Sequence, residues 1–130
     1  MIDTTQLFFT KTHEWLRLEG TQAMVGITQH AQEEISDVVF VELPKVGKNL
    51  KQAEEAAVVE SVKAAFSIYA PVSGTIAQVN ENLSKDPAAI NRSPYDEGWI
   101  FILQVANPEE VKGLMNHQQY EVWVKGGGGH

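Results

Sequence analysis

The chain has 130 residues, of which 43% are hydrophobic, 21% charged and 8% aromatic, a balance typical of one folded domain and not of a disordered segment. Its formal charge is −7, from 17 acidic and 10 basic residues. Because the basic side chains are scattered, nucleic acid and anionic membranes are disfavoured as partners, and proteins with basic docking faces are favoured. Cysteine is absent, which excludes disulfides, thiolate zinc sites and cysteine nucleophiles.

The ends of the chain and its apolar runs indicate a compartment and a domain layout. No apolar run approaches the roughly 18 residues of a membrane span, and residues 1–5 show no signal or transit character. We expect a bacterial cytoplasm, or the mitochondrial matrix if a transit peptide has been removed. We predict a monomer with one domain over residues 1–125 and a flexible glycine-rich tail over 126–130.

The first part of the chain predicts a hairpin followed by a helix. Strands are expected over residues 15–18 and 23–27, because short apolar runs rich in β-branched and aromatic residues flank a turn containing glycine. Thr28 can then cap a helix over residues 29–35, since its hydroxyl can accept a hydrogen bond from a free amide of the first turn.

The middle of the chain predicts further short strands. A strand over residues 38–43 should end at Pro44, which lacks the amide hydrogen that a central ladder needs. Similar apolar runs predict strands over residues 56–62, 66–69, 75–79 and 99–105.

The C-terminal quarter predicts helices. Asn107 supplies a cap, Pro108 suits the first helical position and Glu110 falls at the capping-box site, so residues 108–115 should be helical. A second short helix is expected after Asn116. The helices should cover one end of the β-structure with an apolar stripe of core residues, namely Val111, Leu114 and Met115.

A weak internal repeat relates residues 43–50 to residues 76–83. Leu or Ile, Val, Asn and Leu match at an offset of 33 residues. Each copy is read as a strand followed by a turn, with Gly47 or Asn80 where a positive φ is easiest to reach. Unless this likeness is chance, two such units related by a pseudo-twofold axis would form a flattened β-sandwich.

The midpoint of this repeat falls just before Lys63, which places that lysine on the connecting hairpin. A lysine at a hairpin turn is either an ordinary surface charge or an amine presented for covalent modification. Its small neighbours Ser61, Ala64 and Ala65 leave room for the active site of another protein to enclose the tip. Glu60 either orients that enzyme or pairs with Lys63.

Five ordered blocks of the sequence resemble signatures of a known family, the H proteins of the glycine cleavage system. The block around the lysine, Glu-Ser-Val-Lys-Ala-Ala over 60–65 followed by Ile-Tyr-Ala-Pro-Val-Ser-Gly over 68–74, resembles the family's lipoylation segment. The other blocks are His-Glu-Trp at 13–15, Val-Gly-Ile-Thr and His-Ala-Gln within 25–32, Val-Val-Phe-Val-Glu-Leu-Pro at 38–44, and Pro-Tyr with Gly-Trp-Ile within 94–100. Together they cover about residues 7–123.

Together with the predicted strands, this resemblance implies a mostly β fold. The expected architecture is a barrel-sandwich hybrid of the lipoyl/biotinyl type, with short flanking helices and a helical C-terminal segment. The resemblance also implies a carrier and not an enzyme. Lipoic acid would be joined to Lys63 by an amide bond, with Glu60 as a recognition residue for the attaching enzyme.

The partners implied by the resemblance are enzymes that visit the lipoyl arm in turn. A pyridoxal-phosphate-dependent glycine decarboxylase would load an aminomethyl group, a tetrahydrofolate-dependent aminomethyltransferase would remove its methylene unit, and a flavin-dependent dihydrolipoyl dehydrogenase would reoxidise the arm. A lipoate ligase or lipoyl transferase would attach the arm. An alternative is a protein of the same kind that relays lipoyl groups to 2-oxoacid dehydrogenase complexes.

The resemblance also implies a groove in which the loaded arm folds back and is shielded from water. Glu14 would bind the aminomethyl cation there, and His30 would line the groove. The alternatives are that Glu14 is a surface charge on a strand edge and that His30 is an ordinary residue on a helix surface. The family commonly has aspartate where Ser67 stands. The contact that this aspartate would make to the amine of the aminomethyl group would therefore be weaker here or supplied by another residue. Phe66 would instead add apolar cover beside the arm.

Other classes match the sequence less well. A biotin carrier has methionine on both sides of its lysine, whereas Val62 and Ala64 flank Lys63. Lipoyl domains of the 2-oxoacid dehydrogenases usually place aspartate before the lysine and lack both the His-Glu-Trp block and the helical C-terminus. An enzyme would need a nucleophile with a base, or several metal ligands. The four histidines, at 13, 30, 117 and 130, lack the short spacing of a zinc site. A purely structural adaptor is favoured even less than an enzyme.

Overall fold

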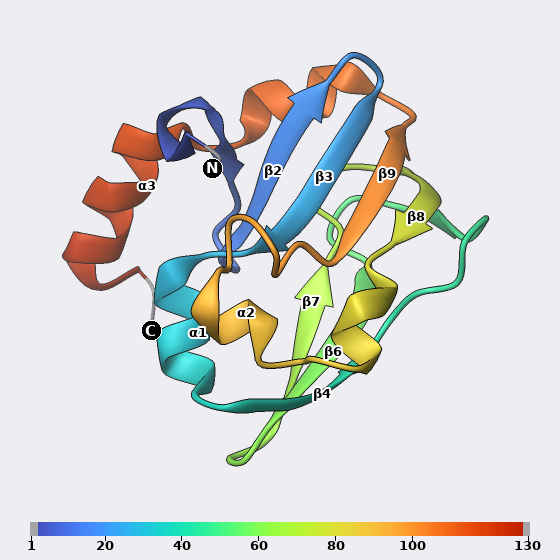
Figure 1. Ribbon diagram of the computed structural model, residues 1–130. Coiled ribbons are helices and arrows are strands. Elements are labelled where there is room, and N and C mark those ends of the chain that lie inside the picture. Colours follow the sequence, from blue (N-terminus) through green and yellow to red (C-terminus); the bar gives the residue numbers. More distant parts are fainter. Residues whose placement is uncertain (1–2, 129–130) are drawn as a thin grey trace.

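Residues 3–128, which the computed structural model describes, form nine strands in two antiparallel sheets, with short helices at their edges (Figure 1). The larger sheet has the order β1 (Phe8–Phe9), β2 (Glu14–Glu19), β3 (Gln22–Ile27), β9 (Phe101–Val105), β8 (Gly74–Val79) and β5 (Asn49–Leu50). The smaller sheet has the order β4 (Val38–Glu42), β6 (Glu55–Ser61) and β7 (Ala65–Tyr69). The predicted mostly β, sandwich-like fold is confirmed.

Short helical segments close the ends of this sandwich. In chain order they are η1 (Thr4–Gln6), α1 (Gln29–Ile35), η2 (Glu81–Ser84), α2 (Ala89–Arg92), η3 (Pro108–Gly113), α3 (His117–Trp123) and the π-helical turn η4 (Val124–Gly128). Figure 1 shows α3 beside the N-terminal segment, at one side of the sheets. The Thr28 cap is confirmed, because its hydroxyl accepts from the Ala31 amide at 3.1 Å. Asn116 and Gln119 form a reciprocal capping box that begins α3.

The apolar residues divide into two clusters. The main one fills the space between the sheets and includes the inward-facing positions of β3, β6 and β9. The second consists of Leu7, Phe9, Trp15 and Tyr120, and it attaches α3 to the outer strands of the larger sheet. The predicted C-terminal stripe is confirmed as core packing, since Val111 is buried in the main cluster and Leu114 and Met115 pack against the two clusters.

The predicted strands correspond to observed strands with shifts of one or two residues at their ends. The strand expected over 38–43 is β4, and the one expected over 99–105 begins at Phe101. The two-residue strands β1 and β5 and the short helix α2 were not predicted. All three are too short to show a period, and the two strands are defined by their pairing with β2 and β8.

The C-terminal helix prediction needs a correction. Residues 108–113 form a 3₁₀-helix, with Asn107 accepting from the Glu109 amide, and the predicted helix does not reach Met115. Glu110 does not complete a capping box. Its carboxylate instead accepts hydrogen bonds from the Ser73 amide at 2.7 Å and hydroxyl at 3.0 Å, because a tertiary partner competes with the local cap.

The repeat predicted one backbone conformation correctly and one wrongly. Gly47 has φ +91°, but Asn80 has φ −85°, and its amide donates to the carbonyls of Glu97 and Trp99. The first copy also does not begin as a strand, because residues 43–48 form a loop before β5. The hairpin at the midpoint is present, with Lys63 in the turn between β6 and β7.

The end of the chain and the helix lengths complete the description. The tail predicted for residues 126–130 begins within η4, and its last two residues lie outside the described range, so its flexibility stays a prediction. Within residues 3–128, no helix combines the length and the apolar character that crossing a membrane requires.

The contact between Trp15 and Gly26 gives a prediction about stability. The two residues are opposite each other on β2 and β3, and a Cβ on Gly26 would lie 2.7 Å from the buried Trp15 ring. The ring cannot move easily, because its Nε1 donates to the Pro94 carbonyl at 2.9 Å. We expect Gly26→Ala to lower the free energy of unfolding by about 1–3 kcal/mol in urea titrations.

The matched control is Gly113→Ala, whose new Cβ would meet nothing within 4 Å. It should change the free energy of unfolding by less than about 0.5 kcal/mol. Equal losses in the two variants would contradict the packing explanation.

Candidate functional site

The turn that carries Lys63 has an ordered backbone. The Ser61 hydroxyl accepts from the Lys63 amide at 3.0 Å and from the Ala64 amide at 3.3 Å, and the Ser61 amide donates to the Ala64 carbonyl at 2.9 Å. The Val62 amide donates to the Asp37 carbonyl at 3.1 Å, which ties the tip to the start of β4. The lysine side chain is therefore exposed on a hairpin tip whose backbone is held in place.

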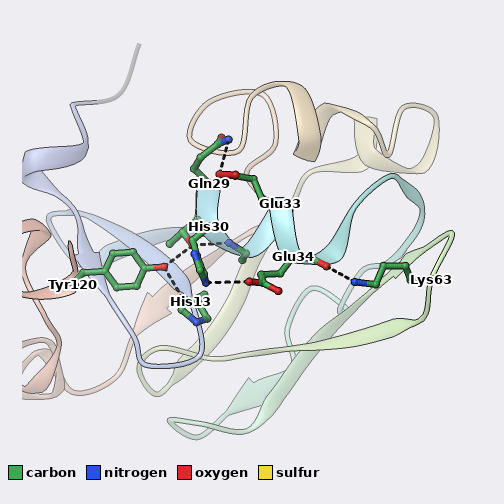
Figure 2. A network of polar contacts seen from close by, with 9 residues as sticks. His13, Gln29, His30, Glu33, Glu34, Lys63 and Tyr120 are labelled. Carbon is green, nitrogen blue, oxygen red and sulfur yellow. Dashed lines mark hydrogen bonds and ion pairs between the residues drawn. The ribbon is translucent and has the colours of Figure 1, made fainter. Parts of the chain in front are cut away.

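The Lys63 amine contacts the C-terminal end of α1. Its Nζ donates to the Glu34 carbonyl oxygen at 2.9 Å, as the dashed line in Figure 2 shows. The last carbonyls of a helix lack intrahelical partners and carry partial negative charge, so a cation is stabilised there. Glu60 is exposed and forms no ion pair with Lys63 within residues 3–128, so the alternative in which the two side chains pair is not observed.

A cavity of about 270 Å³ lies between α1 and β7, and we call it the α1–β7 cavity. Glu34, whose carbonyl binds the Lys63 amine, lines it. Its walls are largely apolar, with polar groups of Thr12 and His13 also present. The full lining is Thr12, His13, Ile27, Ala31, Glu34, Ile35, Phe66, Ser67 and Ile68.

A second cavity, of about 290 Å³, contains the Glu14 side chain in its wall, and we call it the Glu14 cavity. Phe9, Pro71 and Leu114 supply part of its apolar lining. Thr12 lines both cavities. The Glu14 cavity therefore neighbours the α1–β7 cavity, whose lining includes Glu34, the residue that the Lys63 amine contacts.

Glu14 is a buried carboxylate and only 1% exposed. Its Oε1 accepts from the hydroxyls of Thr10 and Thr12, each at 2.5 Å, and its Oε2 accepts from the Tyr69 amide at 3.1 Å. Burial raises the pKa of Glu14 above its usual 4.5, although the hydrogen bonds from Thr10 and Thr12 act in the opposite direction. The alternative of a strand-edge surface charge is wrong.

The hydrogen bonds of Glu14 leave capacity for a ligand. A carboxylate offers about four lone-pair positions, and contacts within residues 3–128 occupy three of them. A cationic amine in the Glu14 cavity would find a desolvated negative charge with one acceptor position on Oε2. Such a pair is stronger than one at an exposed surface, because less water competes for it.

The two histidines near this site lie in different cavities. His30 lines a space between α1 and α3, with Nε2 3.7 Å from the Glu34 carboxylate. His13 lines the α1–β7 cavity, and its ring centre is 4.7 Å from that of His30. His13 also shares a 2.6 Å hydrogen bond with the Tyr120 hydroxyl (Figure 2). That hydroxyl lies 2.8 Å from the Thr28 hydroxyl.

These contacts hold His13 in an unusual backbone conformation. Its φ is +72°, a value that costs a non-glycine residue about 1–3 kcal/mol unless the surroundings compensate. Burial also raises the pKa of Tyr120 to about 12, so its hydroxyl remains neutral at physiological pH. The network therefore gives the α1–β7 cavity an ordered polar wall.

Ser67 and Phe66 are neighbours on β7 and both line the α1–β7 cavity. The Ser67 hydroxyl donates to the Glu55 carboxylate at 2.7 Å. Phe66 is partly buried and packs against the main core cluster. Ser67 therefore presents a hydroxyl that Glu55 already uses, beside the aromatic ring of Phe66.

Several residues of this site were not predicted from the sequence. They are Thr10, Thr12, Glu34, Tyr69 and Tyr120. The sequence did contain a signal for the burial of Glu14 at the start of β2, where threonines precede it by four and two residues and the strand that follows is mostly apolar.

The described part of the chain contains no cluster of three or more His, Cys, Asp or Glu side chains that could hold a metal ion.

Comparisons with known proteins agree over nearly the whole chain. The family model described as glycine cleavage H-protein matches residues 7–126. The chain is 50% identical over 115 residues to the glycine cleavage system H protein of Endomicrobium trichonymphae, covering 88% of this chain and 93% of that protein. It is 51% identical over 113 residues to that of Methylacidiphilum infernorum, with coverages of 87% and 88%. The crystal structure of a glycine cleavage system H protein from Mycobacterium marinum matches with a TM-score of 0.83 and 34% identity, over 95% of this chain and 98% of that one.

The raised pKa of Glu14 predicts a pH dependence of stability. Because the folded state binds the proton more tightly than the unfolded state does, the destabilising effect is absent below pH about 4.5 and develops as the pH rises through the folded pKa. Glu14→Gln removes this titration, and it can keep the three contacts with its Oε1 accepting from the Tyr69 amide and its Nε2 donating to the hydroxyls of Thr10 and Thr12. In urea titrations between pH 4.5 and 7, wild type should lose stability relative to Glu14→Gln.

The companion variant Glu14→Ala separates charge from hydrogen bonding. It leaves the Tyr69 amide without its acceptor, so we expect a loss of about 1–3 kcal/mol at every pH relative to Glu14→Gln. Parallel pH profiles for wild type and Glu14→Gln would show that the Glu14 pKa is not raised.

Proposed function

The chain belongs to the glycine cleavage H-protein family, and on that premise we propose that it is the lipoyl carrier of a glycine cleavage system, with lipoic acid joined to Lys63 by an amide bond. The observation that supports this most strongly is the exposed amine on an ordered hairpin tip, which contacts Glu34 in the lining of a largely apolar cavity, while a buried carboxylate lines the neighbouring cavity. A carrier needs an attachment point and a resting place for its arm, and this arrangement offers both.

The residues present suit a lipoyl group. Lys63 offers a primary amine that an enzyme can reach. Ile35, Phe66 and Ile68 line the adjacent cavity with apolar surface that suits an aliphatic chain. When bound, the dithiolane of the lipoyl group supplies the reversible sulfur chemistry by which an aminomethyl group is accepted and released.

The protein itself positions the attachment point, shields the arm from water and holds the amine of the cargo. Ser61 orders the backbone beneath Lys63, so that the attachment point is presented in one geometry. The walls of the α1–β7 cavity exclude water from an arm that lies against them. Glu14 holds the positively charged amine of the cargo, and the approach of that cation favours the ionised form of the carboxyl group.

His30 and Ser67 take supporting roles in this proposal. His30 contacts the His13 ring and steadies the wall that His13 forms. Ser67 presents a hydroxyl that is shared with Glu55, so the cargo amine relies mainly on Glu14. Phe66 adds apolar cover at the same wall.

The carrier would meet four enzymes. They are a lipoate ligase or lipoyl transferase for attachment, a pyridoxal-phosphate-dependent glycine decarboxylase, a tetrahydrofolate-dependent aminomethyltransferase and a flavin-dependent dihydrolipoyl dehydrogenase. The carrier would be a monomer, and each enzyme would bind it in a transient complex. The setting would be a bacterial cytoplasm. Relay of lipoyl groups to 2-oxoacid dehydrogenase complexes is not favoured, since the relatives are glycine cleavage system H proteins.

The proposal is tested by Lys63→Arg. The guanidinium keeps the positive charge near the Glu34 carbonyl, so the free energy of unfolding should change by less than about 0.5 kcal/mol. After incubation with lipoate ligase, lipoate and ATP, intact mass and peptide mapping should show a lipoyl increment on wild type and none on the variant. The control Lys51→Arg should be modified like wild type, and a lipoyl increment on another residue of Lys63→Arg would overturn the assignment.

Glu60 gives a second test of the attachment site. Its exposed carboxylate lies three residues before Lys63 on β6. If the attaching enzyme recognises this charge, Glu60→Gln should slow the initial rate of lipoyl attachment roughly two- to tenfold at low salt. Glu81→Gln, at an exposed position on η2, should leave the rate unchanged; an unchanged rate for Glu60→Gln as well would make Glu60 an ordinary surface charge.

A further inference from the structure

Three exposed apolar side chains gather beside the Lys63 tip. Val39 and Phe40 on β4 are 55% and 51% exposed, and Val62 in the turn is 68% exposed. We call these three residues the tip patch. An apolar cluster that remains open to water next to a modification site calls for an explanation.

A β-bulge exposes two of these residues together. In the register of β4 and β6, Val38 is opposite Ser61 and Phe40 is opposite Glu60, so Val39 is an extra residue. In a regular strand, Val39 and Phe40 would point to opposite faces, but a bulge can turn both to the same side. Val38 and Val41 remain buried around them, so the exposed pair belongs to a well-packed strand.

The tip patch is continuous with the lysine turn. The hydrogen bond from the Val62 amide to the Asp37 carbonyl holds Val62 next to the start of β4. Glu60 is opposite Phe40 on one side and Ala65 on the other, across the small sheet. A protein that encloses Lys63 therefore meets the tip patch in the same contact.

The surroundings of the tip patch are acidic. The segments 33–44 and 55–62 contain no lysine or arginine. The carboxylates nearest the tip are Glu34, Asp37 and Glu60, and all three are exposed. Glu42 and Glu55 lie farther along the small sheet, where Lys45 and Lys48 line the same surface pocket. The complementary partner surface is an apolar pocket rimmed by basic side chains.

We propose that the tip patch is the docking surface for the enzyme that attaches the lipoyl group to Lys63, a ligase that presents an apolar pocket with a basic rim beside its acyl-adenylate site. This inference rests on the proposed function, because it takes Lys63 as the attachment residue. It adds the surface by which the attaching enzyme recognises the tip.

The reacting atom selects this partner among the enzymes of the system. During attachment, the neutral Nζ of Lys63 forms a C–N bond to the acyl carbon, the C–O bond to AMP breaks, AMP leaves with the electron pair and the amine gives a proton to water. The ligase must therefore surround the tip itself and lift Nζ from the Glu34 carbonyl. Aminomethyl transfer by the fully lipoylated variants shows separately whether the enzymes that act on the far end of the arm use the same patch.

The test compares Phe40→Ser and Val62→Ser with two matched controls. Val46 and Val122 are 63% and 66% exposed but lie on the loop before β5 and on α3, so Val46→Ser and Val122→Ser remove similar exposed apolar surface elsewhere. Urea titrations establish that each variant is folded. Initial rates of lipoyl attachment at subsaturating carrier, followed by intact mass with lipoate ligase, lipoate and ATP, give kcat/KM.

We expect kcat/KM for attachment to fall about tenfold in Phe40→Ser, as for the central apolar residue of an interface, and several-fold in Val62→Ser, with both controls at the wild-type value. Wild-type kcat/KM should also fall with rising salt, because the acidic surroundings attract the basic rim. Once fully lipoylated with excess ligase, the two variants should support aminomethyl transfer at the wild-type rate.

Three results would overturn the proposal. Wild-type attachment rates in both folded variants would show that the ligase does not use the tip patch. Equal losses in Val122→Ser would show that the effect is not local, and a loss of aminomethyl transfer in the fully lipoylated variants would assign the patch to the later enzymes. If wild type itself gains no lipoyl group on Lys63, the proposed function fails as well, and the wild-type sample distinguishes that case from the others.

Discussion

A buried carboxylate joins the two sheets of this protein. Glu14 belongs to β2 of the larger sheet, and it accepts from the Tyr69 amide of β7, an edge strand of the smaller sheet. The carboxylate thus takes the place that a further strand would have at that edge. Removing its charge from water is costly, and the hydroxyls of Thr10 and Thr12 offset part of that cost. The same arrangement puts a desolvated negative charge in a cavity wall, so one interaction serves both the fold and the site.

The Lys63 tip combines a fixed backbone with a free side chain. Ser61 holds the turn and the Val62 amide ties it to the Asp37 carbonyl, while the lysine side chain donates to the Glu34 carbonyl. Such a contact at an exposed helix end is weak enough to break when an enzyme takes the amine. The tip therefore combines precise presentation of the amine with its easy release to the attaching enzyme.

The sequence predicted best where neighbouring residues interact. The β2–β3 hairpin, the Thr28 cap and the β6–β7 hairpin follow from short apolar runs, turn residues and a hydroxyl beside a helix start. It failed where a distant partner captured a polar group. Asn80 was expected at a positive φ, yet its amide is bound by carbonyls 17 and 19 residues away. Glu110 was expected in a local cap, yet Ser73 holds its carboxylate.

By itself, the sequence determined the order of the strands along the chain, the caps and the placement of Lys63 on a hairpin, because alternation, capping and turn formation act over a few residues. Only the tertiary structure decided that Glu14 is buried, that His13 and not His30 lines the α1–β7 cavity, and that Lys63 meets the end of α1. Those features depend on contacts between residues 55, 107 and 29 positions apart. Such contacts form only when the sheets and helices pack together, and no local pattern encodes the partner.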